Sequence, residues 1–224
     1  MFEHANLVTP HEVKVINGPS GRFYISPTTN ERYPSITTVL GAKEKPQLAA
    51  WKLAVGDKKA AAVAKEAADR GSAVHDMLEK FLKNDPAPTA GYDPVLTREF
   101  NQLRLLLKKI SLIYAQEIAL YSDTLKVAGR VDCIAVYNGT LAVIDFKTSK
   151  NNKTSTMIDS YYKQAAFYAL AFEEMYGIQI DNIVILMSVE NGIVPLVFKQ
   201  KVEDWIEPLV HDVQEYHKTH RRSR

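Results

Sequence analysis

Two aspartates and a lysine lie on the strands of a predicted β-hairpin near the middle of the chain. Asn138-Gly139 separates two runs rich in β-forming residues, which is the strongest short-range signal for a two-residue hairpin loop. With this loop, Asp132 and Asp145 face each other on neighbouring strands, and their Cβ atoms lie roughly 4.5–5.5 Å apart. Side-chain alternation puts Lys147 on the same face as Asp145. Two facing carboxylates repel unless a cation lies between them, so this spacing predicts a divalent metal site.

Solvated charges at a strand end are the alternative interpretation of the two aspartates. The flanking runs, residues 131–137 and 141–144, are apolar and almost continuous, which indicates strands covered on both faces. Charges at the end of a buried sheet need partners, and this need favours the metal site. A β-bulge would shift the register by one residue and separate the pair. Replacing either aspartate should relieve repulsion, so we expect the metal-free variants to be at least as stable.

Four motifs in this order resemble the active-site signature of the PD-(D/E)XK nuclease superfamily, in its RecB-like branch. They are RGSAVHDMLE with Gly71 and His75, GRVD with Asp132, VIDFKT with Asp145 and Lys147, and KQAAFY with Gln164 and Tyr168. The stretch YPSITTVL, followed by Trp51, also resembles the N-terminal part of mitochondrial genome maintenance exonucleases and their phage relatives. The resemblance covers roughly residues 33–190.

The resemblance implies a metal-dependent nuclease. Asp132, Asp145, the Phe146 carbonyl and His75 would be the ligands of Mg²⁺ or Mn²⁺, the cations that suit oxygen donors. Lys147 would orient the attacking water or stabilise the negative charge that develops on the phosphate. The number of bound ions, one or two, stays open.

The downstream motif places Gln164 and Tyr168 on one face of a predicted helix, because they are four residues apart. Such residues usually pack at the boundary of a core. The resemblance implies a catalytic role for both, in which their helix lies behind the site and helps to hold the catalytic strand and the substrate.

Three further side chains are candidates for the same site. His75 lies beside an apolar helical stripe, where a lone histidine is usually a packed boundary residue, but its motif favours a metal ligand. Glu79 is one turn further on the same helix face, and either orients His75 or is simply solvated. Glu117 is a candidate for an additional active-site carboxylate.

Two segments are candidates for contacts with nucleic acid. The hydroxyls of Ser35, Thr37 and Thr38 either donate to phosphates or belong to a capped helix start or buried strand. The polar segment after Lys147 carries basic side chains where a phosphate backbone would pass, although a charge run is commonly just solvated. These basic residues are Lys150, Lys153 and Lys163.

The order of predicted elements gives an α/β or α+β fold with a central mixed β-sheet flanked by helices. Residues 1–224 form a single nuclease domain in this interpretation. Residues 1–45 hold a hairpin around Asn17-Gly18 and the PSITTVL segment, residues 46–200 the catalytic core, and residues 201–224 a helix and a basic tail.

Inside the core, helices are expected over residues 46–82, from Asp93-Pro94 to about residue 114, and over 161–176. Gly56 and Gly71 are the weak points of the first helix. Strands are expected at about residues 117–121, 126–137 and 141–147, and in a last hairpin around Asn191-Gly192.

Composition bounds the function. The 224 residues are 46% hydrophobic and 24% charged, with a net charge of +2, so nucleic acid would bind to a local patch. The single cysteine, Cys133, excludes an internal disulfide and a four-cysteine zinc site or iron–sulfur cluster. No P-loop, secretory signal or transmembrane run is present. We expect a cytoplasmic protein of a bacterial or phage-infected cell, with no membrane partner and a mitochondrial location also open.

The leading hypothesis is a DNA exonuclease that prefers single strands or ends and works in replication, recombination or genome processing, with proteins of those processes as partners. A restriction-type endonuclease is the first alternative, and the lack of a target-recognition module argues against it. A non-catalytic nucleic-acid-binding module is the second. The intact carboxylates and lysine argue against that second alternative.

Overall fold

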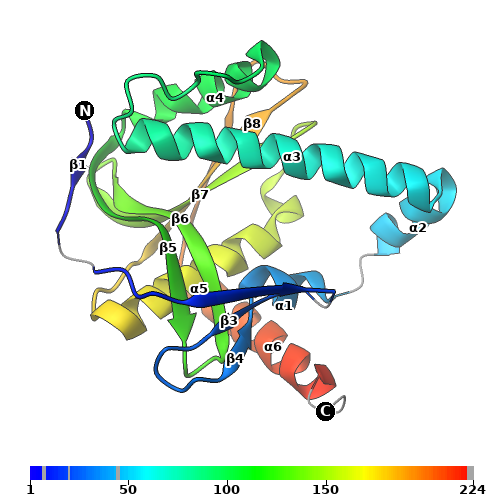
Figure 1. The fold of residues 1–224 in the computed structure, drawn as a ribbon, viewed down its shortest axis with the longest axis vertical. Helices are drawn as coiled ribbons and strands as arrows, with labels where there is room; N and C mark the ends of the chain where they lie inside the picture. Colours follow the sequence, from blue (N-terminus) through cyan, green and yellow to red (C-terminus); the bar gives the residue numbers. More distant parts are fainter. Residues whose placement is uncertain (7–8, 20, 44–45, 221–224) are drawn as a thin grey trace.

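The computed structural model describes residues 1–6, 9–19, 21–43 and 46–220. At its centre is a mixed sheet of six strands in the order β1-β5-β6-β7-β8-β9 (Figure 1). The strands of this sheet are β1 Glu3–His4, β5 Ile110–Ser122, β6 Val127–Tyr137, β7 Thr140–Ser149, β8 Asn182–Val189 and β9 Leu196–Lys201. The last four residues of the expected basic tail lie outside the described residues.

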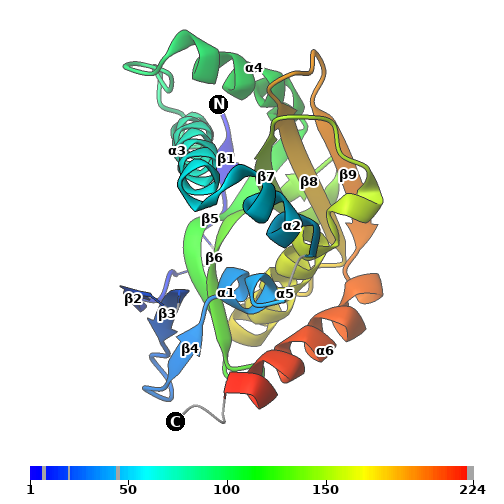
Figure 2. The same cartoon turned by 90° about the vertical axis from the view of Figure 1, so that its right-hand side faces the viewer.

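Helices cover both faces of this sheet (Figure 2). On one face, α3 (Asp57–Leu82) and α4 (Pro94–Leu107) bury an apolar cluster against the strands. On the other, α5 (Asp159–Tyr176) and α6 (Glu203–His220) bury a second and larger cluster. The predicted mixed fold with a helix-flanked sheet is therefore confirmed.

The meander of β5, β6 and β7 is antiparallel, as predicted. Asn138 and Gly139 form the loop between β6 and β7 with φ values of 50° and 83°, the two positive angles of a type I′ turn. The next connection is different, because β7 and β8 are parallel and need a crossover. The crossover consists of a short 3₁₀ turn, Ser155–Met157, and the helix α5.

A smaller antiparallel sheet precedes the core, formed by β2 (Lys14–Gly18), β3 (Gly21–Ile25) and β4 (Arg32–Pro34). Its hairpin turn lies two residues later than predicted, because Asn17 pairs with Arg22 and Gly18 with Gly21. The loop thus takes up Pro19, which has no N–H for a strand ladder. Gly21 has a φ of 111°, which favours glycine. The short helix α1, Ile36–Gly41, follows β4.

Two helix predictions need correction. The helix expected over residues 46–82 is two helices, α2 (Pro46–Val55) and α3, because the chain turns at Gly56 with a φ of 83°. Gly71 does not interrupt α3. The helix expected to reach residue 114 ends at Leu107, and Ile110 begins β5, because strand pairing with β6 overrides the helical spacing of apolar residues.

The first turns of α3 and all of α2 extend past the edge of the sheet (Figure 1). The residues between Ala61 and Asp69 on α3 are exposed, whereas Val74, Met77 and Leu78 are fully buried. Apart from Ala60, which is buried, packing therefore fixes the second half of this helix. No helix among the described residues is long and apolar enough to span a membrane.

Candidate active site

A cleft of about 500 Å³ lies between the second half of α3, the small N-terminal sheet and the strands β5, β6 and β7. Its size is in the range of ligand-binding clefts. Nine of the candidate residues from the sequence line it: Ser35, Thr37, His75, Glu79, Glu117, Asp132, Lys147, Gln164 and Tyr168. Asp145 lies just beneath and is bonded to Lys147.

The ion pair of Asp145 and Lys147 is the buried centre of the site. Their side chains are 1% and 18% exposed, and Lys147 Nζ lies 2.6 Å from one carboxylate oxygen of Asp145 and 2.7 Å from the other. Burial raises the pKa of Asp145 to about 6, although Lys147 opposes this shift. Burial alone would lower the pKa of Lys147, but the charges of Asp145 and Asp132 outweigh it and raise that pKa. Lys147 is therefore protonated at neutral pH.

A chain of hydrogen bonds holds Lys147 from the side of α5. Lys147 Nζ donates to Oε1 of Gln164 at 3.3 Å, and Nε2 of Gln164 donates to the Tyr168 hydroxyl at 3.1 Å. Gln164 is 9% exposed and Tyr168 2%. The two residues share a helix face, as predicted from their spacing, and the chain fixes the position of the lysine.

Gly129 makes room for this arrangement. A Cβ atom on Gly129 would lie 2.8 Å from Cε1 of Tyr168 and 3.1 Å from Cγ2 of Ile36. The glycine of the GRVD motif therefore lets the tyrosine of the helix motif lie against β6. The two motifs, far apart in sequence, form one packed unit.

The predicted register of β6 and β7 is confirmed from Tyr137–Thr140 up to the pair Cys133–Ile144. The next pair would be Asp132 and Asp145, but the ladder ends before it, so the two carboxylates are not a regular facing pair. Instead, Oδ2 of Asp132 accepts a hydrogen bond from the backbone N–H of Phe146 at 2.8 Å. The aspartate side chain takes the place of a ladder carbonyl at this point.

Asp132 belongs to a group with His75 and Glu117. One ligand atom from each of the three lies within 4.8 Å of the others. His75 Nδ1 is 3.6 Å from Oδ1 of Asp132, and its ring meets Phe146 edge-on with centroids 6.2 Å apart. Burial raises the pKa of Glu117 to about 8, with a further contribution from the charge of Asp132. The histidine predicted as a ligand thus faces Asp132, and Glu117 completes the group.

Glu117 owes its place to an irregular strand. It has a φ of 52° in the middle of β5, a left-handed conformation that is rare for a residue with a side chain. On this strand Ala115 and Ile118, three residues apart, both enter the cluster under α5. Regular alternation would put them on opposite faces. The left-handed backbone of Glu117 interrupts this alternation and the side chain lines the cleft, which period-two reasoning could not find.

Glu79 also lines the cleft, but Lys83 Nζ donates to its carboxylate at 2.6 Å. Its charge is therefore partly neutralised on its own helix.

Of the three predicted hydroxyl side chains, those of Ser35 and Thr38 have a structural role at the start of α1. Ser35 is buried and caps α1, where its Oγ accepts the backbone N–H of Thr38 at 3.0 Å. The Thr38 hydroxyl contacts Ser35 at 2.7 Å and does not line the cleft. The alternative of a capped helix start is thus confirmed. Thr37 is exposed at the cleft.

The three lysines predicted to contact nucleic acid have different surroundings in the structure. Lys150 is exposed beyond the end of β7. Lys153 donates to the Tyr161 hydroxyl at 3.1 Å. Lys163 is paired with another helix, because its Nζ lies 2.7 Å from Oδ2 of the buried Asp212 on α6, and its contact with nucleic acid stays a prediction. This partner is 49 residues away, and nothing in the local sequence indicated it.

Two arginines of the cleft were missed by the sequence analysis. Arg22 comes from β3 and Arg130 from β6, and both line the cleft opposite α3. Arg130 lies inside the GRVD motif, where its position two residues before Asp132 was the available signal.

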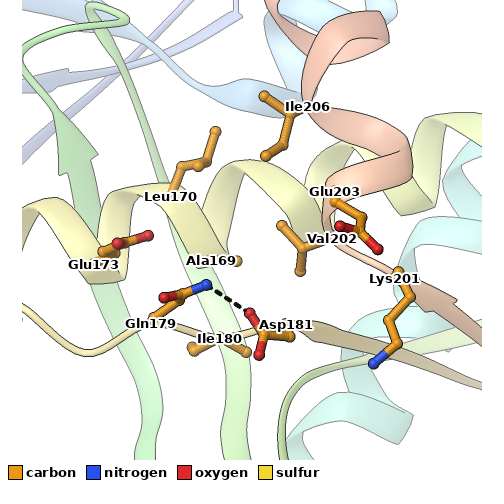
Figure 3. Close-up of a pocket in the computed structure, with 10 residues that line it drawn as sticks. All are labelled: Ala169, Leu170, Glu173, Gln179, Ile180, Asp181, Lys201, Val202, Glu203 and Ile206. Atoms are coloured by element: carbon orange, nitrogen blue, oxygen red, sulfur yellow. Dashed lines mark hydrogen bonds between the residues drawn. The ribbon is translucent and has the colours of Figure 1, made fainter.

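A second cavity of about 330 Å³ lies between α5, the segment before β8 and the start of α6 (Figure 3). Leu170, Val202 and Ile206 lie around it, and Gln179 donates to Asp181 at its edge at 2.8 Å. None of the predicted site residues lines this cavity, so it is separate from the cleft.

Comparison with known proteins shows which family this chain resembles. A model described as the PD-(D/E)XK nuclease superfamily matches residues 95–191. The predicted family resemblance is confirmed. The matched residues include Asp132, Asp145, Lys147 and the α5 motif, whereas Arg22 and His75 lie before them.

The chain is 27% identical over 177 residues to the mitochondrial genome maintenance exonuclease 1 of Mus musculus, covering 74% of this chain and 52% of that protein. It is 28% identical over 127 residues to the protein of the same name from Homo sapiens, covering 55% and 37%. The chain thus spans about half or less of the length of these relatives.

A solved structure of an exonuclease candidate from Eubacterium rectale is 10% identical, with a TM-score of 0.45, over 65% of this chain and 64% of that one. This similarity is too low to support an inference about the chain.

Proposed function

We propose that this chain is a divalent-metal-dependent DNA exonuclease that acts on single strands or ends. The observation that carries the proposal is the convergence of Asp132, Asp145 and Lys147 with His75 at one cleft. The names of the matched family and of the relatives support a nuclease and, more narrowly, an exonuclease. A role in replication, recombination or genome processing belongs to the same proposal.

The donor atoms of the cleft fit a hard divalent cation. The three grouped side chains of His75, Glu117 and Asp132 offer two carboxylates and one imidazole within 4.8 Å. Oxygen-rich sets of this kind suit Mg²⁺ or Mn²⁺. Asp145 and the Phe146 carbonyl would complete the site on the β7 side. A bound cation would polarise the phosphate and lower the pKa of a bound water.

Lys147 would stabilise the negative charge that develops on the scissile phosphate. Its raised pKa keeps it protonated, so it donates hydrogen bonds and does not remove a proton. Gln164 and Tyr168 hold its ammonium group, and the ring of Tyr161 lies 5.0 Å from it. The lysine thus has a fixed position before substrate arrives, which is the requirement for electrostatic preorganisation.

The decisive experiment is digestion of end-labelled single-stranded, double-stranded and circular DNA with Mg²⁺ or Mn²⁺, and with EDTA as the control. We expect linear single strands to be degraded from an end, circular DNA to stay intact, and EDTA to stop the reaction. Lys147→Gln should lower turnover by roughly 100-fold or more, because it removes transition-state stabilisation.

Each alternative gives a different result in the same experiment. Cleavage of circular DNA would show an endonuclease. Binding without cleavage under every metal condition would show a non-catalytic module. A matched RNA substrate tests the choice of DNA, because equal degradation of both would remove DNA specificity from the proposal.

A further inference from the structure

We infer that Arg22 and Arg130 form a binding site for a backbone phosphodiester of the substrate strand, beside the metal ligands. This inference rests on the proposed function for the chemical class of its ligand. It assigns a second wall of the cleft, opposite α3, to the nucleotide next to the one that is cleaved.

The first arginine is held rigidly although its side chain is exposed. The backbone N–H of Arg22 donates to the Thr38 hydroxyl at 3.3 Å, and its carbonyl accepts from the N–H of Ser35 at 2.8 Å. Its Nε donates to Oδ1 of Asn17, a neutral partner, at 3.1 Å. The terminal nitrogens of this guanidinium have no hydrogen bond or ion pair with the described residues.

The second arginine is tied to the first through one residue. Ser35 bonds Arg22 on one side and forms a parallel bridge to Ala128 of β6 on the other. Arg130 follows Ala128 by two residues, on the same face of the strand. It also precedes Asp132 by two residues, roughly 6.8 Å along the strand. The small sheet therefore brings Arg22 to the part of β6 that carries Asp132.

Arg130 remains available for a ligand. Its side chain is 60% exposed, and its Nε lies 3.7 Å from Oε2 of Glu117, beyond hydrogen-bond distance. A phosphate oxygen can therefore approach the guanidinium without breaking a hydrogen bond within the described protein.

The charges around the cleft favour binding of a polyanion at the wall that carries Arg22 and Arg130. On the α3 side, Asp76 pairs with Lys80 and Glu79 with Lys83, at 2.7 and 2.6 Å. The third cation of the lining, Lys147, is bonded to Asp145. The two arginines are therefore the cations of the described lining that lack a carboxylate partner within hydrogen-bond distance.

Arginine suits this ligand because its planar group donates two parallel hydrogen bonds to a phosphate. Such contacts fix the path and register of a strand without reading its sequence. A phosphodiester on this wall would place the following one at the ligand group of Asp132. The pair thus acts as a positioning device for the proposed reaction.

The test measures binding separately from cleavage. Fluorescence anisotropy of a labelled oligothymidylate in EDTA, over a range of salt concentrations, compares wild type with Arg22→Gln and Arg130→Gln. Arg104→Gln on α4 is the matched control, because Arg104 is exposed and does not line the cleft. We expect about a tenfold rise in Kd for each cleft variant, the value of one charge-assisted hydrogen bond.

The salt dependence and a modified substrate identify the phosphate. The slope of log Kd against log salt should fall by roughly 0.7 for each lost contact with single-stranded DNA. One methylphosphonate linkage near the end should weaken wild-type binding and have no added effect in the double variant. Arg→Lys variants should keep the slope but lose affinity, because lysine does not bind bidentately.

Unchanged Kd in both glutamine variants, or weaker binding of the glutamine variants with an unchanged slope, would overturn the inference. Thermal unfolding midpoints equal to wild type are required for each variant. A lysine variant replaces any glutamine variant that fails this requirement, and an unchanged Kd in that lysine variant would then overturn the inference. Cleavage with unaltered binding in both variants would refute the arginine site alone. Loss of binding in a chain that never cleaves would refute the proposed function and leave this site standing.

Discussion

Glu117 and Asp132 lie on neighbouring strands between the same two ladder pairs, Gln116–Cys133 and Ile118–Val131. Neither residue takes part in the ladder. On β6, Val131 and Ile134 enter the same apolar cluster although they are three residues apart. The sheet is therefore irregular at one level on both strands, and this irregularity turns two carboxylates into the cleft. Residues in strained conformations often occur at functional sites.

The buried carboxyl of Glu117 should make stability depend on pH. Its folded pKa of about 8 lies above its ordinary value of 4.5, so the folded protein binds one more proton between these pH values. Stability is full below the lower value and falls as the pH rises to about 8. We expect Glu117→Gln to remove this fall and to exceed wild type by about 1–2 kcal/mol at pH 8, after solvent screening.

Urea unfolding in EDTA between pH 5 and 8.5 measures this difference. Added Mg²⁺ or Mn²⁺ should reduce it, because a cation stabilises the ionised carboxylate. Parallel stability curves for wild type and Glu117→Gln would contradict the assignment of the raised pKa.

Variants of the two aspartates should differ in stability, although both residues belong to the proposed metal site. Asp132→Asn removes a charge that faces Glu117, and its amide oxygen still accepts the Phe146 N–H, so the metal-free protein should be as stable as wild type. Asp145→Asn leaves Lys147 buried without its carboxylate and should cost on the order of 3 kcal/mol. The expectation of relieved repulsion therefore fails for Asp145. Urea unfolding at pH 7 in EDTA separates the variants, and equal stabilities would disprove the ion-pair argument.

Gly129→Ala should disturb Lys147 from a distance. The new Cβ would lie 2.8 Å from the Tyr168 ring, so the tyrosine must move and with it Gln164. We expect a loss of about 1–3 kcal/mol and a lower turnover. Gly41→Ala is the matched control, because no heavy atom lies within 4 Å of its added Cβ. Thermal unfolding and a single-turnover assay should show a defect only at Gly129.

Lys150 and Lys163 should give opposite phenotypes. Lys150→Gln should weaken DNA binding and lower the salt slope by roughly 0.7, with stability unchanged. Lys163→Gln should lower stability instead. Burial would raise the pKa of Asp212, but its bonds to Lys163 and Lys43 outweigh this and lower it. That stabilisation is present above the ordinary pKa of aspartate and is lost as the pH falls.

Anisotropy and urea unfolding at pH 7 and pH 3 check both lysines. The loss of stability in Lys163→Gln, relative to wild type, should be smaller at pH 3 than at pH 7. A stable Lys163→Gln variant with weakened DNA binding would reverse the assignment.

The parts of the site that could be predicted depend on local geometry. The Asn138-Gly139 turn fixed the register of β6 and β7, and the spacing of Gln164 and Tyr168 fixed their common helix face. Both follow from the repeat of a regular element. Lys147 and Asp145 were correctly placed on one face for the same reason.

The remaining parts depend on tertiary contacts that no local pattern encodes. The left-handed Glu117 breaks the alternation on which the strand prediction relied. Lys163 is bonded to a residue on another helix. Arg22 reaches the cleft only because a separate sheet is tied to β6 through Ser35. The helical spacing of apolar residues also continues past Leu107, but strand pairing with β6 ends the helix there.

The crossover helix α5 links the order of folding to the completion of the site. Parallel β7 and β8 cannot pair until the chain between them has returned along the sheet, and α5 is most of that chain. The same return brings Gln164 to Lys147. A molecule that has closed its sheet has therefore already positioned its lysine, whereas a nascent chain that ends after β7 holds Asp145 and Lys147 without Gln164, which bonds the lysine. Nuclease competence should thus appear late in synthesis, in step with protection of the β8 amides from hydrogen exchange.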